Sequence, residues 1–388
     1  MRIAGIIAEY NPFHNGHKYH IDETRRQTGC DYVIAVMDGN FTQRGEAAAF
    51  SKWTRAKMAL ACGADAVFEL PTLFAVRTAD VFARSGVAIL GGLGADVISC
   101  GSETEDVSLI SALGRLRANE PEAVSAGVNA RLESGMPHAR AWGEAAAEYL
   151  GVAPEALNKP NTILGAEYLR AIEELKFDMK PHIVRRLGEY HDDALGEVAS
   201  ASAIRRGLAA GDVRAALAVP ECVRGCLEEA QHSHSLDDVL LMKLRSMNET
   251  QFAALADVSE GLDMRLMKAC RAAAGREELI ESVKTRRYTH ARISRLLAHA
   301  LLDITQELVR ACPEPAYARL IGMREGAGPL MKELKRRAKL PVVPNPRQLI
   351  GDLVFETECR ASDIWALGRD LPEERRAGRE LTEKFIVL

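Results

Sequence analysis

Long hydrophobic runs are missing from this 388-residue sequence, and aromatic residues make up only 5% of it. No segment approaches the roughly 18 uncharged apolar residues that a membrane-spanning helix needs. The N-terminal apolar run is too short, and lacks the small-residue cleavage site, for a secretory signal peptide. We therefore expect a cytoplasmic protein without a membrane segment.

A large excess of one charge is missing as well, because 50 Lys and Arg residues face 54 Asp and Glu residues, for a net charge of −4. A nearly neutral total argues against a dedicated nucleic-acid binder, but it says nothing about local concentrations of basic residues.

Zinc-binding cysteine motifs are absent too. The eight cysteines are scattered, without a C-x2-C pair and without a nearby histidine at a zinc-ligand spacing. Cys222 and Cys226 lie four residues apart on a predicted helix, where a metal pair is conceivable. Two small residues in a reduced protein are the simpler interpretation, so we predict no metal site in the protein.

The composition that is present, 47% apolar and 27% charged residues, is typical of a globular protein. Apolar runs at residues 3–8, 31–37, 66–70 and 96–100 alternate with helical segments, and a further strand is predicted at 181–186. This alternation predicts an α/β fold with a doubly wound, Rossmann-like parallel sheet. Ligands of such sheets bind beyond the carboxyl ends of the strands.

Two domains are expected from the length and from a change of pattern along the chain. We predict a catalytic domain over residues 1–205, with a helical insertion at about 105–160. Residues 206–388 read almost entirely as helices, so we predict a second, mainly helical domain there.

The most informative segment follows the first strand, where His14 and His17 stand at the first turn of a predicted helix. The unpaired N–H groups and the dipole of a helix N-terminus favour an anion. Two imidazoles can add hydrogen bonds to phosphate oxygens as charge develops, and Gly16 allows a phosphate to approach the backbone. Surface histidines in a turn, or part of a zinc site, are the alternatives; the position directly after the first strand favours a nucleotide site.

The H-x-G-H pattern resembles the H-x-G-H nucleotidyltransferase superfamily, whose members attack the α-phosphate of a nucleoside triphosphate and release pyrophosphate. Residues 200–205 (SASAIR) resemble the Ser-x-x-x-I-R element of that superfamily. The resemblance implies that Ser200, Ser202 and Arg205 contact the triphosphate. Alone, this segment could be no more than a capped helix start.

Longer segments give a narrower resemblance. In order they are EYNPFHNGH, GNFTQRGE, KWTRAKMA, GADAVFELP, CGSE, PNTILG, RRLGEYHD and KTRRYTHARISRLL. Together they resemble the tRNA(Met) cytidine acetate ligase family over most of the chain. Asp38, Ala47, Cys100 and Thr162 stand where the family pattern leads us to expect Ser, Pro, Phe and Asn. Asp38 would add a carboxylate at the mouth of the site.

The resemblance implies a two-step ligase. Acetate and ATP would give acetyl-adenylate and pyrophosphate, and the acetyl group would pass to N4 of the wobble cytidine of elongator tRNA(Met), forming N4-acetylcytidine. His14 and His17 would be catalytic, with Lys18 as a possible helper. Mg²⁺ would arrive with the ATP, held chiefly by phosphates and water, because no cage of carboxylates is visible.

The residues that the resemblance assigns to ATP are the loop after the first strand and three positions further along the chain, with Arg185 as the alternative to Arg186 if the register slips by one. They are Ile7, Ala8, Glu9, Tyr10, Asn11, Pro12, Phe13, His14, Asn15, Gly16, His17, Lys18, Tyr19, His20, Gly101, Asn161 and Arg186.

Basic residues are concentrated in two places in the predicted helical domain. The first holds Lys284, Arg286, Arg287, Arg292 and Arg295, with Tyr288 as a possible base-stacking residue; the second holds Lys332, Lys335, Arg336, Arg337 and Lys339. Such runs are often only solvated helix faces. Beside a nucleotide site they favour contacts with the tRNA backbone, and we predict tRNA binding at the first run.

Three other functions remain open from the sequence: a nucleotidyltransferase acting on a small phosphate ester, an acetate-activating ligase with another acceptor, and a non-catalytic ATP- and RNA-binding protein. The basic helical region argues against the first. The intact His14, Gly16 and His17 argue against the last.

Overall fold

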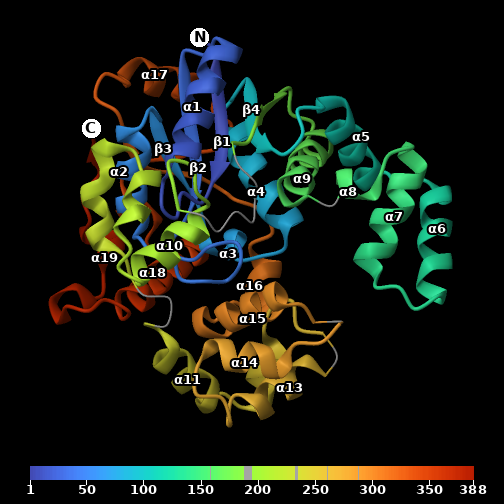
Figure 1. Ribbon diagram of the computed structural model, residues 1–388. Coiled ribbons are helices and arrows are strands. Elements are labelled where there is room, and N and C mark those ends of the chain that lie inside the picture. Colours follow the sequence, from blue (N-terminus) through green and yellow to red (C-terminus); the bar gives the residue numbers. More distant parts are fainter. Residues whose placement is uncertain (158, 188–194, 232–234, 260, 287) are drawn as a thin grey trace.

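The protein is built around a central sheet (Figure 1). The structure is a computed structural model, and it describes all residues except 158, 188–194, 232–234, 260 and 287. Five parallel strands are ordered β5-β4-β1-β2-β3. They are β1 (Ile3–Ala8), β2 (Tyr32–Asp38), β3 (Ala66–Leu70), β4 (Val97–Ser102) and β5 (Lys180–Arg185). The prediction of a Rossmann-like α/β fold is confirmed, with strand ends moved by one or two residues.

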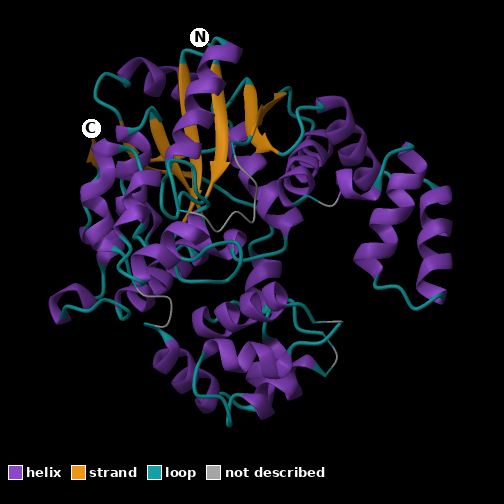
Figure 2. Ribbon diagram, in the orientation of Figure 1, coloured by secondary structure: helices purple, strands orange, loops and turns teal. Residues whose placement is uncertain are grey.

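Helices cover both faces of this sheet (Figure 2). Ile34 and Val36 of β2 belong to the apolar core on one face, while Val33 and Ala35 belong to the core on the other. Side chains of a strand alternate between the two faces, so a strand covered on both sides reads as a continuous apolar run. The covering helices are α1 (Asn15–Thr28) and α2 (Lys52–Ala61) on one side, and α3 (Thr72–Ala75), α4 (Ala79–Gly92), α5 (Val107–Ala118) and α9 (Pro160–Leu175) on the other.

The predicted helical insertion contains α5, α6 (Glu122–Glu133), α7 (His138–Leu150) and the short α8 (Pro154–Leu157), and α9 begins where it ends. Helices α6 and α7 project from the body (Figure 1). None of the described helices combines the length and the apolar character that crossing a membrane requires.

After β5 the chain forms α10 (Ala201–Ala209) and two 3-10 segments, η1 (Val213–Ala218) and η2 (Glu221–Glu229). A helical lobe follows beneath the sheet in Figure 1. It consists of α11 (Asp237–Ser246), α12 (Glu249–Ala254), α13 (Leu262–Ala269), α14 (Arg276–Val283), α15 (His290–Leu302) and α16 (Gln306–Ala311).

The rest of the chain returns to the sheet, which the sequence did not predict. Strand β6 (Ala318–Met323) pairs antiparallel with β3, and β7 (Val342–Val343) and β8 (Ile386–Val387) pair with β6. Between them lie α17 (Gly328–Arg337), η3 (Pro346–Leu349), α18 (Leu353–Ala366), η4 (Pro372–Arg375) and α19 (Arg379–Thr382). The domain boundary at residue 205 stays a prediction, but the sheet itself includes strands from both sides of it.

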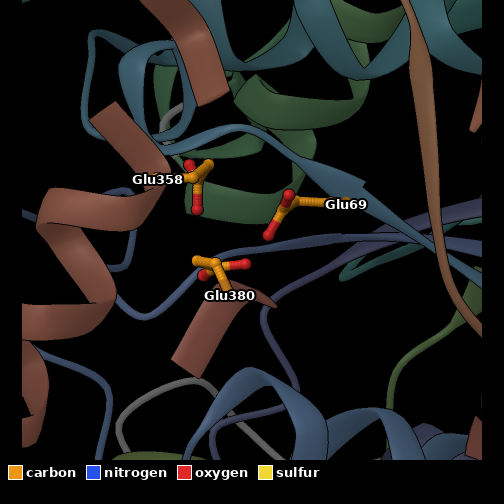
Figure 3. A group of neighbouring side chains, drawn as sticks. All are labelled: Glu69, Glu358 and Glu380. Atoms are coloured by element: carbon orange, nitrogen blue, oxygen red, sulfur yellow. The ribbon is translucent and has the colours of Figure 1, made fainter. Parts of the chain in front are cut away.

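A buried cluster of charges joins these C-terminal elements to the sheet. Figure 3 shows Glu69 of β3, Glu358 of α18 and Glu380 of α19 pointing toward one another. The Lys52 ammonium lies among them, 3.2 Å from Glu358 Oε2 and 2.5 Å from Glu380 Oε1, and also pairs with Glu69. Arg319 of β6 pairs with Glu69 and Glu380. An internal ammonium thus occupies the centre that a metal ion would take.

Candidate active site

A cavity of about 1070 Å³ lies where the predicted nucleotide site was expected, beyond the carboxyl ends of β1, β4 and β5. Its size slightly exceeds the range of about 300–1,000 Å³ that small-ligand sites occupy. The helical lobe closes its far side with apolar side chains, namely Leu236, Leu240, Leu297, Ala298 and Leu301.

Most of the residues predicted to contact ATP line this one cavity. They are Ile7, Ala8, Glu9, Tyr10, Asn11, His14, Gly16, His17, Tyr19, His20, Gly101, Asn161 and Arg186, together with Arg185, Ser200, Ser202 and Arg205. The β1–α1 loop, β4, α9, β5 and α10 bring them together from positions up to about 200 residues apart. Their contact with ATP stays a prediction.

Four loop residues lie outside the described cavity wall. Phe13 is fully buried, and Asn15 donates its amide to the carbonyls of Glu197 and Leu217. Lys18 forms an ion pair with Asp22 (2.7 Å), so its ammonium has a surface partner. Pro12 follows Asn11 through a cis peptide bond and is also absent from the wall.

The two catalytic candidates are part of the cap of α1. The Gly16 N–H donates to His14 Nδ1 (3.1 Å), and the His14 N–H donates to His17 Nδ1 (3.2 Å). Because a backbone N–H can only donate, both Nδ1 atoms must be unprotonated. A neutral ring then carries its proton on Nε2. The capping box therefore fixes the tautomer of both rings and leaves each with an Nε2–H donor.

Both rings are also held neutral. Burial, with the Arg186 charge as a second cause, lowers the pKa of His14 to about 3. Burial and the neighbouring His14 and Arg186 lower the pKa of His17 well below its usual value. The rings stack with centroids 3.6 Å apart, an arrangement that two imidazolium cations would oppose. These histidines can donate hydrogen bonds to an anion without having to be protonated.

The neutral state of His14 makes the fold sensitive to acid. The pKa of His14 is about 3 in the folded protein against 6.5 for an unperturbed histidine. Between these values the unfolded chain binds more protons, so stability falls as the pH drops below 6.5 and this loss is complete near pH 3. By about pH 4.5 the cost is roughly 2–3 kcal/mol.

We therefore expect His14→Asn, which keeps a side chain able to cap the helix, to be the more acid-resistant protein. Between about pH 7.5 and 4.5 the variant should lose roughly 2–3 kcal/mol less unfolding free energy than the wild type. Urea denaturation at both pH values measures this difference. Equal losses in the two proteins would show that His14 is not kept neutral by the fold.

The second wall of the cavity is built by β4, β5 and α9. An added Cβ on Gly101 would meet Arg186 Cγ at 3.3 Å, so this glycine leaves room for the aliphatic part of the Arg186 side chain. The Asn161 amide nitrogen donates to Glu103 Oε1 (2.6 Å), which leaves its carbonyl oxygen as the group for a ligand. Both Arg185 and Arg186 line the cavity, but Arg186 is the one whose charge lowers the pKa of His14, His17 and His20.

The Ser-x-x-x-I-R element starts α10 and also supports the loop. Ser200 caps the helix by accepting a hydrogen bond from the Ala203 N–H (3.1 Å), as the alternative prediction of a capped helix start has it. Arg205 donates to the Asn11 carbonyl (2.7 Å) and lies 3.9 Å from Glu46 Oε2. Ser200, Ser202 and Arg205 all line the cavity, so capping of the helix is compatible with contact to a triphosphate.

Asp38 is not at the mouth of the site, and that expectation was wrong. Its carboxylate is fully buried at the end of β2 and pairs with Arg55 of α2 (2.6 Å). Arg55 also donates to the Glu9 carbonyl (2.6 Å). Asp38 therefore acts beneath the loop as part of its support and is absent from the described cavity wall.

Sequence reasoning missed the contribution of the helical lobe and understated that of residues 41–47. Gln43, Arg44 and Glu46 line the cavity, and the Gln43 N–H donates to Glu9 Oε1 (3.2 Å). Burial raises the pKa of Glu9. The segment GNFTQRGE, which belongs to the family resemblance, could have indicated that this loop takes part in the site. The cavity-lining leucines of the helical lobe belong to no motif that could have done so.

The first basic run divides into exposed and buried residues. Lys284 and Arg286 are exposed, but Lys284 pairs with Glu281 (2.9 Å). Arg292 lies over the Tyr288 ring at 5.5 Å, and Tyr288 is only 7% exposed, so its predicted stacking on a base was wrong. Arg295 is half-buried, and this burial lowers its pKa, so only part of its side chain is open to RNA. Arg287 lies outside the described residues.

The second basic run lies at the end of the sheet where the parallel strands begin, opposite to the cavity. Arg337 of α17 donates to Asp96 (2.9 Å) and to the Met1 carbonyl, both at the amino ends of strands. The cavity lies at the carboxyl ends. The two basic runs therefore cannot be one continuous surface beside the active site.

Comparison with known proteins places this architecture in a family. A family model described as "HIGH Nucleotidyl Transferase" matches residues 1–380. Curated relatives called tRNA(Met) cytidine acetate ligase include one from Acetivibrio thermocellus, 33% identical with 100% of both chains covered. Another, from Clostridium kluyveri, is 36% identical and covers 88% of this chain and 89% of its own.

Solved structures point to the same family as the sequence comparisons. The Thermotoga maritima protein TmcAL, in a crystal structure with alpha-thio ATP, is 29% identical with a TM-score of 0.92, and both chains are covered completely. Its apo form gives a TM-score of 0.93. With the H-x-G-H turn at the carboxyl end of β1 and relatives matched over their full length, this chain belongs to the tRNA(Met) cytidine acetate ligase family of HIGH nucleotidyltransferases.

Proposed function

We propose that this enzyme activates acetate with ATP and transfers the acetyl group to N4 of the wobble cytidine of elongator tRNA(Met). The observation that carries the proposal is the pair of neutral histidines whose Nε2–H groups are set by the helix cap and whose rings line the cavity. Such an activity implies a cytoplasmic location, as we expected from the sequence.

In the first step an acetate oxygen attacks the α-phosphorus of ATP. The bond from that phosphorus to the oxygen bridging to the β-phosphate breaks, and pyrophosphate leaves with its electron pair. Negative charge grows on the phosphate oxygens, and donors already aimed at them stabilise the transition state without reorganising. His14, His17 and the N-terminus of α1 would face the α-phosphate, with Arg186 and Arg205 toward the other phosphates.

Magnesium fits the residues present as a companion of ATP. Glu9 is the carboxylate of the β1–α1 loop in the cavity wall, and Glu46 on the neighbouring loop faces Arg205. One carboxylate together with phosphates and water is a common magnesium environment. Glu9 would hold the ion, which would supply charge neutralisation to the phosphates.

In the second step the N4 amine of cytosine attacks the acetyl carbon, the bond from that carbon to the AMP oxygen breaks, and the amine loses a proton. AMP is a good leaving group, so the enzyme mainly has to position the base. A base in an anticodon loop can be presented unstacked. The helical lobe forms the far wall of the cavity, and its exposed basic residues Lys284 and Arg286 would hold the tRNA backbone.

The direct test is incubation of the protein with ATP, labelled acetate and elongator tRNA(Met), followed by digestion and nucleoside analysis. We expect label in N4-acetylcytidine, with AMP and pyrophosphate formed, and loss of nearly all product when EDTA removes magnesium. Acetate-dependent ATP–pyrophosphate exchange without labelled tRNA would indicate another acceptor. Absence of exchange would remove the ligase function altogether.

A further inference from the structure

Two cysteines from distant parts of the chain meet where the end of α2 packs against the start of η2. Cys62 Sγ and Cys222 Sγ lie 3.7 Å apart although 160 positions separate the residues. Cys62 ends α2 and is buried, whereas Cys222 lies in the first turn of η2. Of the eight cysteines, all of them described, Cys222 is the exposed one.

We propose that Cys62 and Cys222 are a redox modification site, at which a peroxide oxidant forms a reversible disulfide that fastens η2 to α2. A disulfide needs its sulfur atoms about 2.05 Å apart. The remaining approach of less than 2 Å can come from rotation of the exposed Cys222 side chain. This inference is independent of the proposed ligase activity.

The chemistry divides between an accessible and a sheltered thiol. Hydrogen peroxide would oxidise the Cys222 thiolate to a sulfenic acid, releasing hydroxide. The Cys62 thiol would then attack the sulfenic sulfur, so that the S–S bond forms and water leaves with the sulfenic oxygen. Two thiols and one peroxide thus give one disulfide and two waters.

Cys226 offers a built-in comparison on the same 3-10 segment. It is half-buried, and burial raises its pKa as it also raises that of Cys62, so the difference between the two lies in geometry. The sulfur contact of Cys222 is with Cys62 of the neighbouring helix.

The segment that would be fastened forms part of the active-site wall. Leu227 and Glu228 of η2 line the cavity, and Glu229 accepts a hydrogen bond from the Thr54 hydroxyl of α2 (2.5 Å). A disulfide at Cys222 would add a covalent tie at the other end of the same contact between α2 and η2. The oxidised protein should therefore hold this wall more rigidly than the reduced protein.

The experiment treats the reduced, full-length protein with hydrogen peroxide, blocks the remaining thiols and maps the peptides by mass spectrometry. We expect loss of two free thiols, a Cys62–Cys222 cross-linked peptide and recovery with dithiothreitol. Cys222→Ser should lose no thiol pair, while Cys226→Ser should still form the cross-link. A Cys222–Cys226 disulfide, or no thiol loss at all, would overturn the proposal.

Thermal unfolding gives a second readout, because a cross-link that closes a long loop lowers the entropy of the unfolded chain. Oxidation should raise the unfolding midpoint of the wild type and of Cys226→Ser by a few degrees, and leave Cys222→Ser unchanged. A mapped cross-link without any rise in the midpoint would contradict the fastening of η2 to α2.

Discussion

His14→Asn and His17→Gln should each lower acetate-dependent ATP–pyrophosphate exchange by about 10²–10³-fold, the usual cost of removing one preorganised oxyanion donor. In both variants the new side chain can preserve the cap, since Asn is a favoured N-cap residue and Gln is a favoured third residue of a capping box. What is lost is the Nε2–H donor. Radiolabelled pyrophosphate exchange measures the effect.

The controls separate chemistry from folding. Circular dichroism and the unfolding midpoint at neutral pH should stay close to the wild type for both variants. Alanine at the same positions should lose the exchange and also destabilise α1, because it removes a cap worth about 0.5–2 kcal/mol. Near-normal exchange by His14→Asn with an intact fold would exclude this ring from the first step.

Replacing Arg286, Arg287 and Arg292 together with Glu should weaken tRNA binding by about 10²-fold or more, while acetate-dependent exchange stays normal. Each lost phosphate contact also lowers the slope of log affinity against log salt concentration by about one. Filter binding at several salt concentrations measures both quantities. Arg295 is left unchanged because its side chain is half-buried and a carboxylate there would be partly desolvated.

The second basic run supplies a matched control. Replacing Lys332, Lys335 and Arg336 with Glu makes the same change of charge on α17, at the opposite edge of the sheet from the cavity. We expect this variant to bind tRNA much more tightly than the first. Equal weakening by both would mean that total charge, and not the surface beside the active site, governs binding. Normal tRNA acetylation by the first variant would contradict the proposal that the first basic run binds tRNA.

The sequence alone determined the part of the protein whose signals are local. Strands covered on both faces read as apolar runs, so β1 to β5 were recognisable one at a time. His14, Gly16 and His17 were recognisable because a helix N-terminus after the first strand is an anion site whatever lies elsewhere. The longer motifs then identified the family, which full-length relatives and solved structures confirm.

Only the tertiary structure decided which distant residues meet and how deeply they are buried. Strand β6 was missed because it lies within a mainly helical part of the chain and pairs with β3, some 250 residues earlier. Burial likewise removed Asp38 and Tyr288 from the surfaces assigned to them, and it turned His14 and His17 into neutral donors. Local patterns fix elements and motifs, whereas solvation and pairing depend on packing between segments far apart in the chain.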